Sequence, residues 1–180
     1  MKLHREAEDV FSFQLFSKSF CESVLESSHS WGWHAAGVYV PGKRIFSDSR
    51  SCQETEIEDA APLRKAFAEK FKKIVAPALE LCWQWRVRRW EARLIRYPEG
   101  GYYKHHVDYY PEGGRPSRLI SLVCYLNDGF LGGRTVFLRQ NHAVVPQTGK
   151  AIVFPAGITH PHAAESIASG AKYVLAAWFS

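Results

Sequence analysis

From residue 91 to its end, the sequence consists of short runs in which apolar and polar residues alternate, separated by glycine and proline. Because successive side chains of a β-strand point to opposite faces, such runs predict strands with one buried face. The candidate strands are EARLIRY, YYKHHVD, RLISLVCYL, RTVFL, HAVV, KAIVF, HPHAA and KYVLAAWF. Eight strands within about ninety residues predict a closed or sandwiched β-structure.

The first half of the sequence predicts helices that support this β-structure. After a short strand at residues 10–13, Ser17 precedes apolar residues at helical spacing and is a candidate N-cap. Residues 60–85 form the strongest helical stretch, which Pro77 should kink or split. Between them, residues 31–57 predict two short strands and a polar loop at 48–56 that is a candidate mobile lid.

The chain length predicts one domain over residues 1–180, with helical and short-strand support in 1–90 and the β-rich core in 91–180. Hydrophobic residues make up 46% of the chain and charged residues 23%, which is typical of globular proteins and not of disordered ones. The net charge of +5 permits an acidic partner, but the basic residues are scattered apart from Arg86, Arg88 and Arg89. This scatter argues against nucleic acid as a partner.

The four cysteines lie far apart without a Cys-x-x-Cys pair, which predicts reduced thiols rather than disulfides or a zinc site. The N-terminus lacks the apolar run of a signal peptide, and no segment is long enough to span a membrane. These features predict a cytoplasmic protein without membrane contact.

Two residues of YYKHHVD, His106 and Asp108, are candidate metal ligands. Side chains at positions i and i+2 of a strand share one face, so an imidazole and a carboxylate would form two-thirds of a facial metal triad. Alone, the pattern is weak evidence, because Asp108 can also cap the loop that follows the strand.

A second cluster lies fifty-odd residues further on, with His160, His162 and then Lys172 at the start of the apolar run YVLAAWF. Burying a lysine on such a strand costs free energy unless an anion meets its ammonium group. The alternative is a lysine at the strand end whose ammonium reaches the solvent.

Together, these features resemble the iron(II)- and 2-oxoglutarate-dependent oxygenases, and within them the prolyl 4-hydroxylase group. The segments that carry the resemblance are RYPEGGYYKHHVD, SLVCYLNDGFLGGRTVF and GKAIVFPA, and it covers roughly residues 91–179. The sequence departs from the group in HAAESI, where Val-x-Pro-Val often follows the distal histidine. The resemblance implies a mostly β fold, a double-stranded β-helix (jelly-roll) core with N-terminal helices packed against it.

The resemblance also implies an Fe(II) site formed by His106, Asp108 and a distal histidine. Both His160 and His162 compete for the third place, and the ten-residue spacing to Lys172 favours His162. His105 faces the opposite side of the strand and receives no metal role.

For the co-substrate 2-oxoglutarate, the resemblance implies that Lys172 meets the C5 carboxylate, while Tyr97 and Tyr125 help to hold the molecule. Tyr103 is a candidate for lining the iron site, although simple aromatic packing explains it equally well. The further reactant is O2, with ascorbate as a candidate reductant.

The implied activity is hydroxylation of an unactivated C–H bond in an amino acid, a small molecule or a prolyl peptide, with release of succinate and CO2. The carboxylate of Asp108 favours hydroxylation over halogenation in similar enzymes. Substrate identity and oligomeric state are not fixed by the sequence. One alternative is a nucleic-acid demethylase of the same superfamily, although the arginine pair of those enzymes is missing. The other is a non-catalytic cupin-like metal-binding module, which leaves Lys172 unexplained.

Overall fold

The computed structural model describes residues 2–40, 43–109 and 117–180. Its largest element is an eight-stranded sheet. In spatial order its strands are β1 (His4–Ala7), β2 (Val10–Gln14), β14 (Lys150–Pro155), β10 (Ile120–Tyr125), β17 (Lys172–Phe179), β8 (Trp90–Tyr97), β7 (Gln53–Glu56) and β3 (His34–Ala35).

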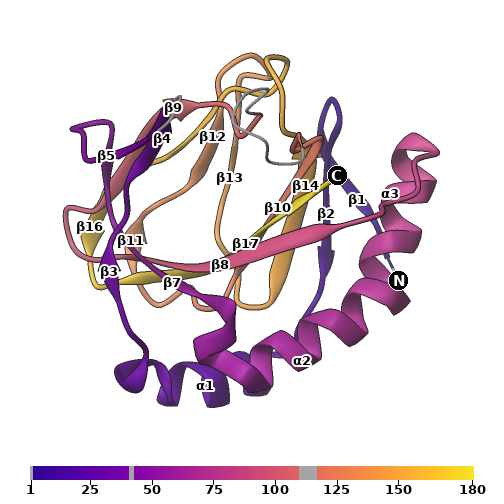
Figure 1. Ribbon diagram of the computed structural model, residues 1–180. Helices are drawn as coiled ribbons and strands as arrows, with labels where there is room; N and C mark the ends of the chain where they lie inside the picture. Colours follow the sequence, from indigo (N-terminus) through magenta and orange to yellow (C-terminus); the bar gives the residue numbers. More distant parts are fainter. Residues whose placement is uncertain (1, 41–42, 110–116) are drawn as a thin grey trace.

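A five-stranded sheet faces the central part of the large one (Figure 1). Its order is β13 (His142–Val144), β12 (Thr135–Phe137), β15 (His162–Ala164), β9 (Tyr102–His106) and β6 (Arg50–Ser51). Two further pairs are β11 (Leu131–Gly132) with β16 (Ile167–Ser169), and β4 (Val38–Val40) with β5 (Lys43–Ile45). All strand pairings among the described residues are antiparallel. The predicted jelly-roll core is confirmed.

The helices cover the outer face of the large sheet, with α1 and α2 along the lower edge of Figure 1 and α3 at its right. They are α1 (Lys18–Glu26), α2 (Ala61–Lys70) and α3 (Ala76–Trp83), with 3-10 turns at Ser28–Ser30 and Ile57–Ala60. The Oγ of Ser17 accepts a hydrogen bond from the backbone N–H of Phe20 at 3.2 Å, so the predicted N-cap is confirmed.

The predicted break in the long helix is also confirmed. A π-helical turn, Phe71–Val75, separates α2 from α3, and Pro77 lies in the first turn of α3. Proline has no N–H to donate to the preceding turn, so the helical hydrogen bonds are rearranged just before it.

The predicted lid at residues 48–56 is wrong. This segment forms β6 and β7, which pass from the small sheet to the large one, and Cys52, Glu54 and Thr55 are buried. Glu54 tolerates burial because Arg93 lies 2.9 Å and Arg50 3.5 Å from its carboxylate oxygens.

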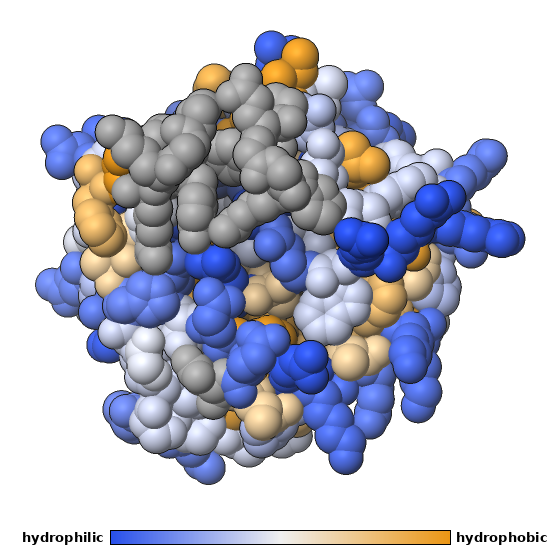
Figure 2. Space-filling model, viewed as in Figure 1, coloured by the Kyte–Doolittle hydropathy of each residue, from blue (hydrophilic) through white to orange (hydrophobic). Residues whose placement is uncertain are grey.

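Alternation along the strands of the large sheet creates two apolar clusters. On β17, Leu175 and Phe179 pack against the helices with Leu63 and Phe67, while Val174 and Trp178 face the small sheet. On the face shown in Figure 2, apolar surface occurs only in small separate areas among hydrophilic side chains. None of the helices in the described ranges is both long enough and apolar enough to cross a membrane.

Candidate active site

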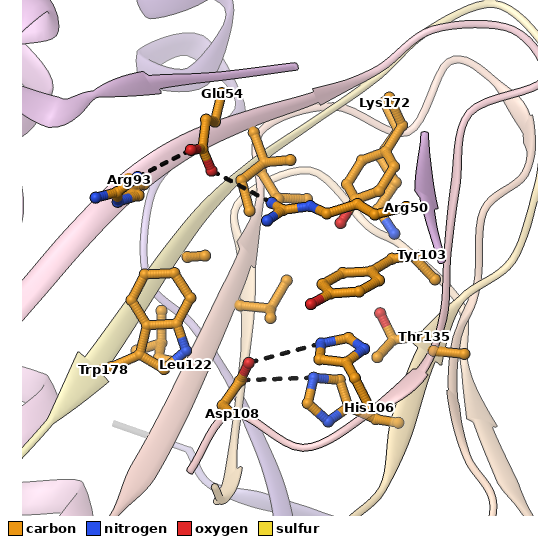
Figure 3. A pocket seen from close by; sticks show the side chains of 18 of the residues that line it. Arg50, Glu54, Arg93, Tyr103, His106, Asp108, Leu122, Thr135, Lys172 and Trp178 are labelled. Carbon is orange, nitrogen blue, oxygen red and sulfur yellow. Dashed lines mark hydrogen bonds and ion pairs between the residues drawn. The ribbon is translucent and has the colours of Figure 1, made fainter. Parts of the chain in front are cut away.

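A pocket lies between the two sheets, and strands from both supply its walls (Figure 3). Within it His106, Asp108 and His162 come together, with one possible ligand atom of each lying within 4.8 Å of the others. The Nε2 atom of His106 is 3.6 Å from Oδ1 of Asp108, and that of His162 is 3.5 Å from Oδ2. The pocket therefore holds two imidazoles around one carboxylate.

The backbone brings these side chains together by two different routes. His106 and His162 are a directly opposite pair in the β9–β15 ladder. Asp108 lies beyond the end of β9, so the prediction that it shares the strand is wrong. Its backbone N–H instead donates to the carbonyl of Ala156 at 2.9 Å, which holds the carboxylate beside the ladder.

Each imidazole is oriented by a backbone carbonyl. The Nδ1 atom of His106 is 2.9 Å from the carbonyl oxygen of Lys104, and Nδ1 of His162 is 3.1 Å from that of His160. These contacts require a proton on Nδ1, which leaves the Nε2 lone pair directed at the shared centre. Burial, followed by the charge of His106, lowers the pKa of His162 to about 4. His162 is therefore neutral at pH 7 and able to bind a metal.

Asp108 is held in its ionised form. The Oγ of Ser121 donates a hydrogen bond of 2.7 Å to its Oδ2. Burial alone would raise the pKa of this carboxyl, but His162, His106 and Arg118 outweigh it and hold the pKa well below the usual range.

His160 lies outside this cluster. Its Nδ1 is 2.9 Å from Oγ1 of Thr159, and its Nε2 is 3.0 Å from the carbonyl oxygen of Glu8 in the β1–β2 turn. Both ring nitrogens are thus engaged, and the contact with Glu8 ties the N-terminal hairpin to the core. Of the two candidates from the sequence, the structure brings His162 into the cluster.

Tyr103 lies against the cluster because of a β-bulge. Between the pairs His162–His106 and Ala164–Tyr103, strand β9 has one residue more than β15. Residues 103 and 106 would otherwise face opposite sides, but the bulge turns both toward the pocket, and their rings stack at 3.5 Å between centroids. Tyr103 therefore supports the His106 ring from one side.

The donor set suits Fe(II). Two imidazoles and one carboxylate, with room on the pocket side, form the facial arrangement typical of non-haem iron oxygenases. Their partners, two backbone carbonyls and the Ser121 hydroxyl, fix the orientation that such a site needs.

Lys172 lies at the other end of the pocket and is only 1% exposed, so the alternative of a lysine that reaches the solvent is wrong. Its Nζ donates to the carbonyl of Gly133 at 2.6 Å and lies 5.3 Å from the ring centres of both Tyr97 and Tyr125. The hydroxyl of Tyr125 donates to Oγ1 of Thr135 at 2.8 Å. Of the residues predicted from the sequence, Lys172 and Tyr97 line the pocket, whereas the buried Tyr125 contacts Lys172 and Thr135 without being a lining residue itself.

Among the residues that the structure describes, the ammonium of Lys172 makes no ion pair with a carboxylate. Burial lowers its pKa to about 7, although the charge of Glu165 acts in the opposite direction. Glu165 is itself held by Arg134 through two contacts of 2.7 Å. An anion that entered the pocket would find a cation whose charge is poorly compensated.

Glycine is needed beside this lysine. Gly133 has φ +66°, and a Cβ there would lie 2.5 Å from Cδ1 of Ile167 and 3.3 Å from Cδ of Lys172. The close approach lets the Gly133 carbonyl reach the ammonium.

The sequence did not predict the guanidinium groups of the pocket. Arg50 lies over the Tyr103 ring at 4.7 Å, and Glu54 links it to Arg93 (Figure 3). Arg50 and Glu54 fall in the segment interpreted as a polar loop. Apolar and polar residues do not alternate in this segment, so periodicity gave no signal for a strand there.

Comparison with known proteins connects this geometry to a family. Residues 92–180 match the family model described as the 2OG-Fe(II) oxygenase superfamily. A protein of Acanthamoeba polyphaga mimivirus, whose provisional name is prolyl 4-hydroxylase, is 28% identical over 164 residues. That match includes 78% of this chain and 66% of the relative, so the chain spans slightly less than two thirds of the relative's length.

Solved structures share the fold. A Pseudomonas putida prolyl-4-hydroxylase superposes with a TM-score of 0.69 at 22% identity, covering 95% of this chain and 91% of that one. A Trichoplax adhaerens prolyl hydroxylase, solved in complex with a peptide fragment of hypoxia inducible factor, gives a TM-score of 0.75 at 16% identity, covering 95% and 83%.

Proposed function

Since the chain belongs to the 2OG-Fe(II) oxygenase superfamily, we propose that it is an Fe(II)- and 2-oxoglutarate-dependent hydroxylase. The substrate would be an amino acid, another small molecule or a prolyl peptide. The observation that carries the proposal is the convergence of His106, Asp108 and His162 in a pocket that also contains the buried Lys172. The reaction consumes substrate, 2-oxoglutarate and O2 and yields hydroxylated substrate, succinate and CO2.

In this proposal His106, Asp108 and His162 hold Fe(II), which supplies the redox chemistry that activates O2. The backbone carbonyls on both Nδ1 atoms and the Ser121 hydroxyl keep the three donors in place when the pocket is empty. Little reorganisation is then needed when the metal binds.

Lys172 would receive the C5 carboxylate of 2-oxoglutarate, and Tyr97 and Tyr125 would enclose it. The co-substrate carboxylate restores the full charge of the ammonium, since an adjacent anion raises the pKa of a buried lysine. Val174 and Ala176 line the pocket between Lys172 and Trp178 and exclude water from the reacting centre.

The four cysteines are unpaired, with Cys21, Cys52 and Cys124 buried, which supports our proposal of a reducing, cytoplasmic location. Ascorbate is proposed as the reductant that keeps the iron in its Fe(II) form.

Metal binding by single alanine variants tests the proposed site. We expect H106A, D108A and H162A to lose Fe(II), because each removes one of three ligands. H160A is the matched control, since it removes a neighbouring buried imidazole whose nitrogens contact Thr159 and Glu8. It should retain the metal with some loss of stability. Full metal occupancy in H106A would overturn the assignment.

Succinate formation from 2-oxoglutarate tests the activity. The Fe(II)-loaded protein should form succinate, at a higher rate when amino acids or prolyl peptides are added. A protein that binds Fe(II) and never consumes 2-oxoglutarate would instead be a non-catalytic metal-binding module.

A further inference from the structure

Positive charge is concentrated in two segments of the chain. Residues 61–90 contain eight lysines and arginines against two glutamates, and residues 2–5 add Lys2 and Arg5 without any acidic side chain. These two segments together carry a net charge of +8. The remaining residues contain thirteen basic and sixteen acidic side chains, a net charge of −3. The positive excess of the protein therefore belongs entirely to the N-terminus and to the part of the chain from α2 to the start of β8.

The fold brings these two segments side by side. Lys2 and Arg5 line an open pocket at the edge of the large sheet, together with Ile74 of the π-helical turn. Arg5 lies directly opposite Phe11 in the β1–β2 ladder, and Phe11 contacts Trp83 at the end of α3 with 5.5 Å between ring centres. The N-terminus accordingly lies beside α3 in Figure 1.

The connection between α3 and β8 directs arginines into the solvent. Gln84 ends α3 in the left-handed conformation, with φ 52°, and residues 85–89 then lead to β8 outside any helix or strand. Trp85 and Val87 pack against the helix-side core, whereas Arg86 and Arg88 are exposed. Burial thus alternates along this connection, so that its apolar residues point inward and its guanidinium groups point outward.

An aromatic contact places these arginines beside the π-helical turn. Trp90, which follows Arg89 directly, lies against Phe71 with 6.2 Å between ring centres. Lys72 and Lys73 follow Phe71 and are exposed. Cations from the N-terminus, the turn and the connection therefore form one surface, which we call the basic face. Its members are Lys2, Arg5, Lys72, Lys73, Arg86, Arg88 and Arg89.

Little of this charge is neutralised within the protein. Arg86 pairs with Glu80 at 3.1 Å, and Nε of Arg5 donates to the carbonyl of Ala7 at 3.4 Å. Among the described residues, no ion pair with a carboxylate engages the other five members. Neighbouring like charges repel one another, and a partner with several negative charges would relieve this repulsion.

The structure of the basic face favours an extended polypeptide over nucleic acid. Strand β1 is the edge of the large sheet and, within the described part of the chain, pairs only with β2. The outer side of such a strand can pair with an added one. Bases would instead need flat aromatic faces on which to stack. The indole N–H of Trp83 donates to Asp9 at 3.2 Å, and the Trp90 ring packs against Phe67, so these rings are used within the protein.

We infer that the basic face binds an extended acidic segment of a partner protein. The backbone of this segment pairs with β1, and its carboxylates contact the lysines and arginines. The helices cover the face of the large sheet opposite the pocket that holds the metal ligands, so a bound segment leaves that pocket open. The inference does not depend on the proposed hydroxylase activity.

Binding of fluorescently labelled probes to the full chain tests the inference. The main probe is a peptide of alternating glutamate and serine, and its matched control has glutamine in place of glutamate. A single-stranded oligothymidylate of the same net charge and vesicles that contain phosphatidylserine represent the other polyanions. The variants are K2Q/R5Q, R88Q/R89Q and the two combined. The control variant K104Q/R139Q removes two exposed charges on the side of the small sheet.

We expect the acidic peptide to bind at least about 10-fold more tightly than the glutamine peptide, with an affinity that falls as the salt concentration rises. K2Q/R5Q and R88Q/R89Q should each weaken binding by about 3- to 10-fold, and the combined variant by about the product. K104Q/R139Q should stay within about twofold of the wild type. Amide hydrogen exchange in β1 should slow when the acidic peptide is bound, because an added strand protects its edge.

Four results would overturn the inference. They are equal binding of the two peptides, full affinity in both double variants, unchanged exchange in β1, and binding of oligothymidylate or vesicles at least as tight as that of the acidic peptide. The last result would assign the basic face to nucleic acid or to a lipid surface. Failure of every probe to bind would also overturn it, and the charges on β1 would then serve only to protect an exposed strand edge from pairing.

Discussion

The two faces of the eight-stranded sheet are built from the same strands but serve different ends. On β17, odd-numbered residues from 173 to 179 pack toward the helices, whereas even-numbered residues from 172 to 178 line the pocket. Four buried residues that can carry charge, namely Glu54, Asp108, His162 and Lys172, lie on the pocket side. Alternation along a strand thus separates the apolar packing that stabilises the fold from the groups proposed to bind metal and co-substrate.

The largest expected effect comes from K172M on the pocket face. The apparent KM for 2-oxoglutarate should rise by about two to four decades, because the carboxylate loses the cation proposed to bind it. The free energy of unfolding should not fall, since a poorly compensated buried cation is replaced by an apolar side chain. Succinate assays and urea unfolding measure the two effects. K65M, on exposed α2, is the control, and an unchanged KM in K172M would contradict the proposed role.

L175A, on the opposite face of the same strand, should give the reverse pattern. Leu175 is fully buried in the helix-side cluster, so its truncation should lower the free energy of unfolding by about 2–5 kcal/mol. The KM for 2-oxoglutarate should stay within about twofold, since the removed atoms point away from the pocket. A shift in KM as large as that of K172M would show that the two faces are not independent.

S121A should produce a smaller effect, confined to the metal. Without its hydroxyl donor, Asp108 is less firmly oriented, and metal affinity should fall by about 10- to 100-fold. Competition with a chelator measures this change. C124A, on the same strand but facing the helices, should alter stability without altering metal affinity. If C124A lowered metal affinity and S121A did not, Ser121 would not be the residue that orients Asp108.

The smallest expected effect is that of pH on the pocket face. With the pKa of ligand-free Lys172 near 7, its ammonium is present below that pH and is lost as the pH rises. The KM for 2-oxoglutarate should therefore increase above pH 7, by up to about tenfold per unit. His162, with a pKa near 4, does not titrate in this range. K172M should show no such slope, and a KM that falls with pH would contradict the explanation.

Sequence reasoning succeeded where periodicity was strong. The strands of the core, the N-cap at Ser17 and the break near Pro77 follow from local chemistry that the chain carries in adjacent residues. It failed at residues 48–56, because a segment rich in charged residues is typical of an exposed loop. Only the tertiary structure supplies Arg93, from β8, to neutralise the buried Glu54.

The candidate site could be predicted only in part, because some of its contacts join residues that lie far apart in the sequence. Spacing favoured His162 over His160 but could not explain the choice, since the partner of His160 is a carbonyl 152 residues away in sequence. Arg118 carried no local signal at all. Its position at the pocket depends on Trp178 and Glu91, which lie on two other strands and contact its guanidinium group.

The pairing of His106 with His162 has a consequence for how the protein can vary. Their separation is set by the hydrogen-bonded ladder between β9 and β15, not by the length of chain that joins them. Insertions or deletions in the connections between these strands would leave the imidazoles opposite each other. A slip of one residue in the ladder would instead bring Ala163 opposite His106 and turn His162 to the other face. Loop length is therefore free to change in relatives and in engineered variants, whereas the strand register is not.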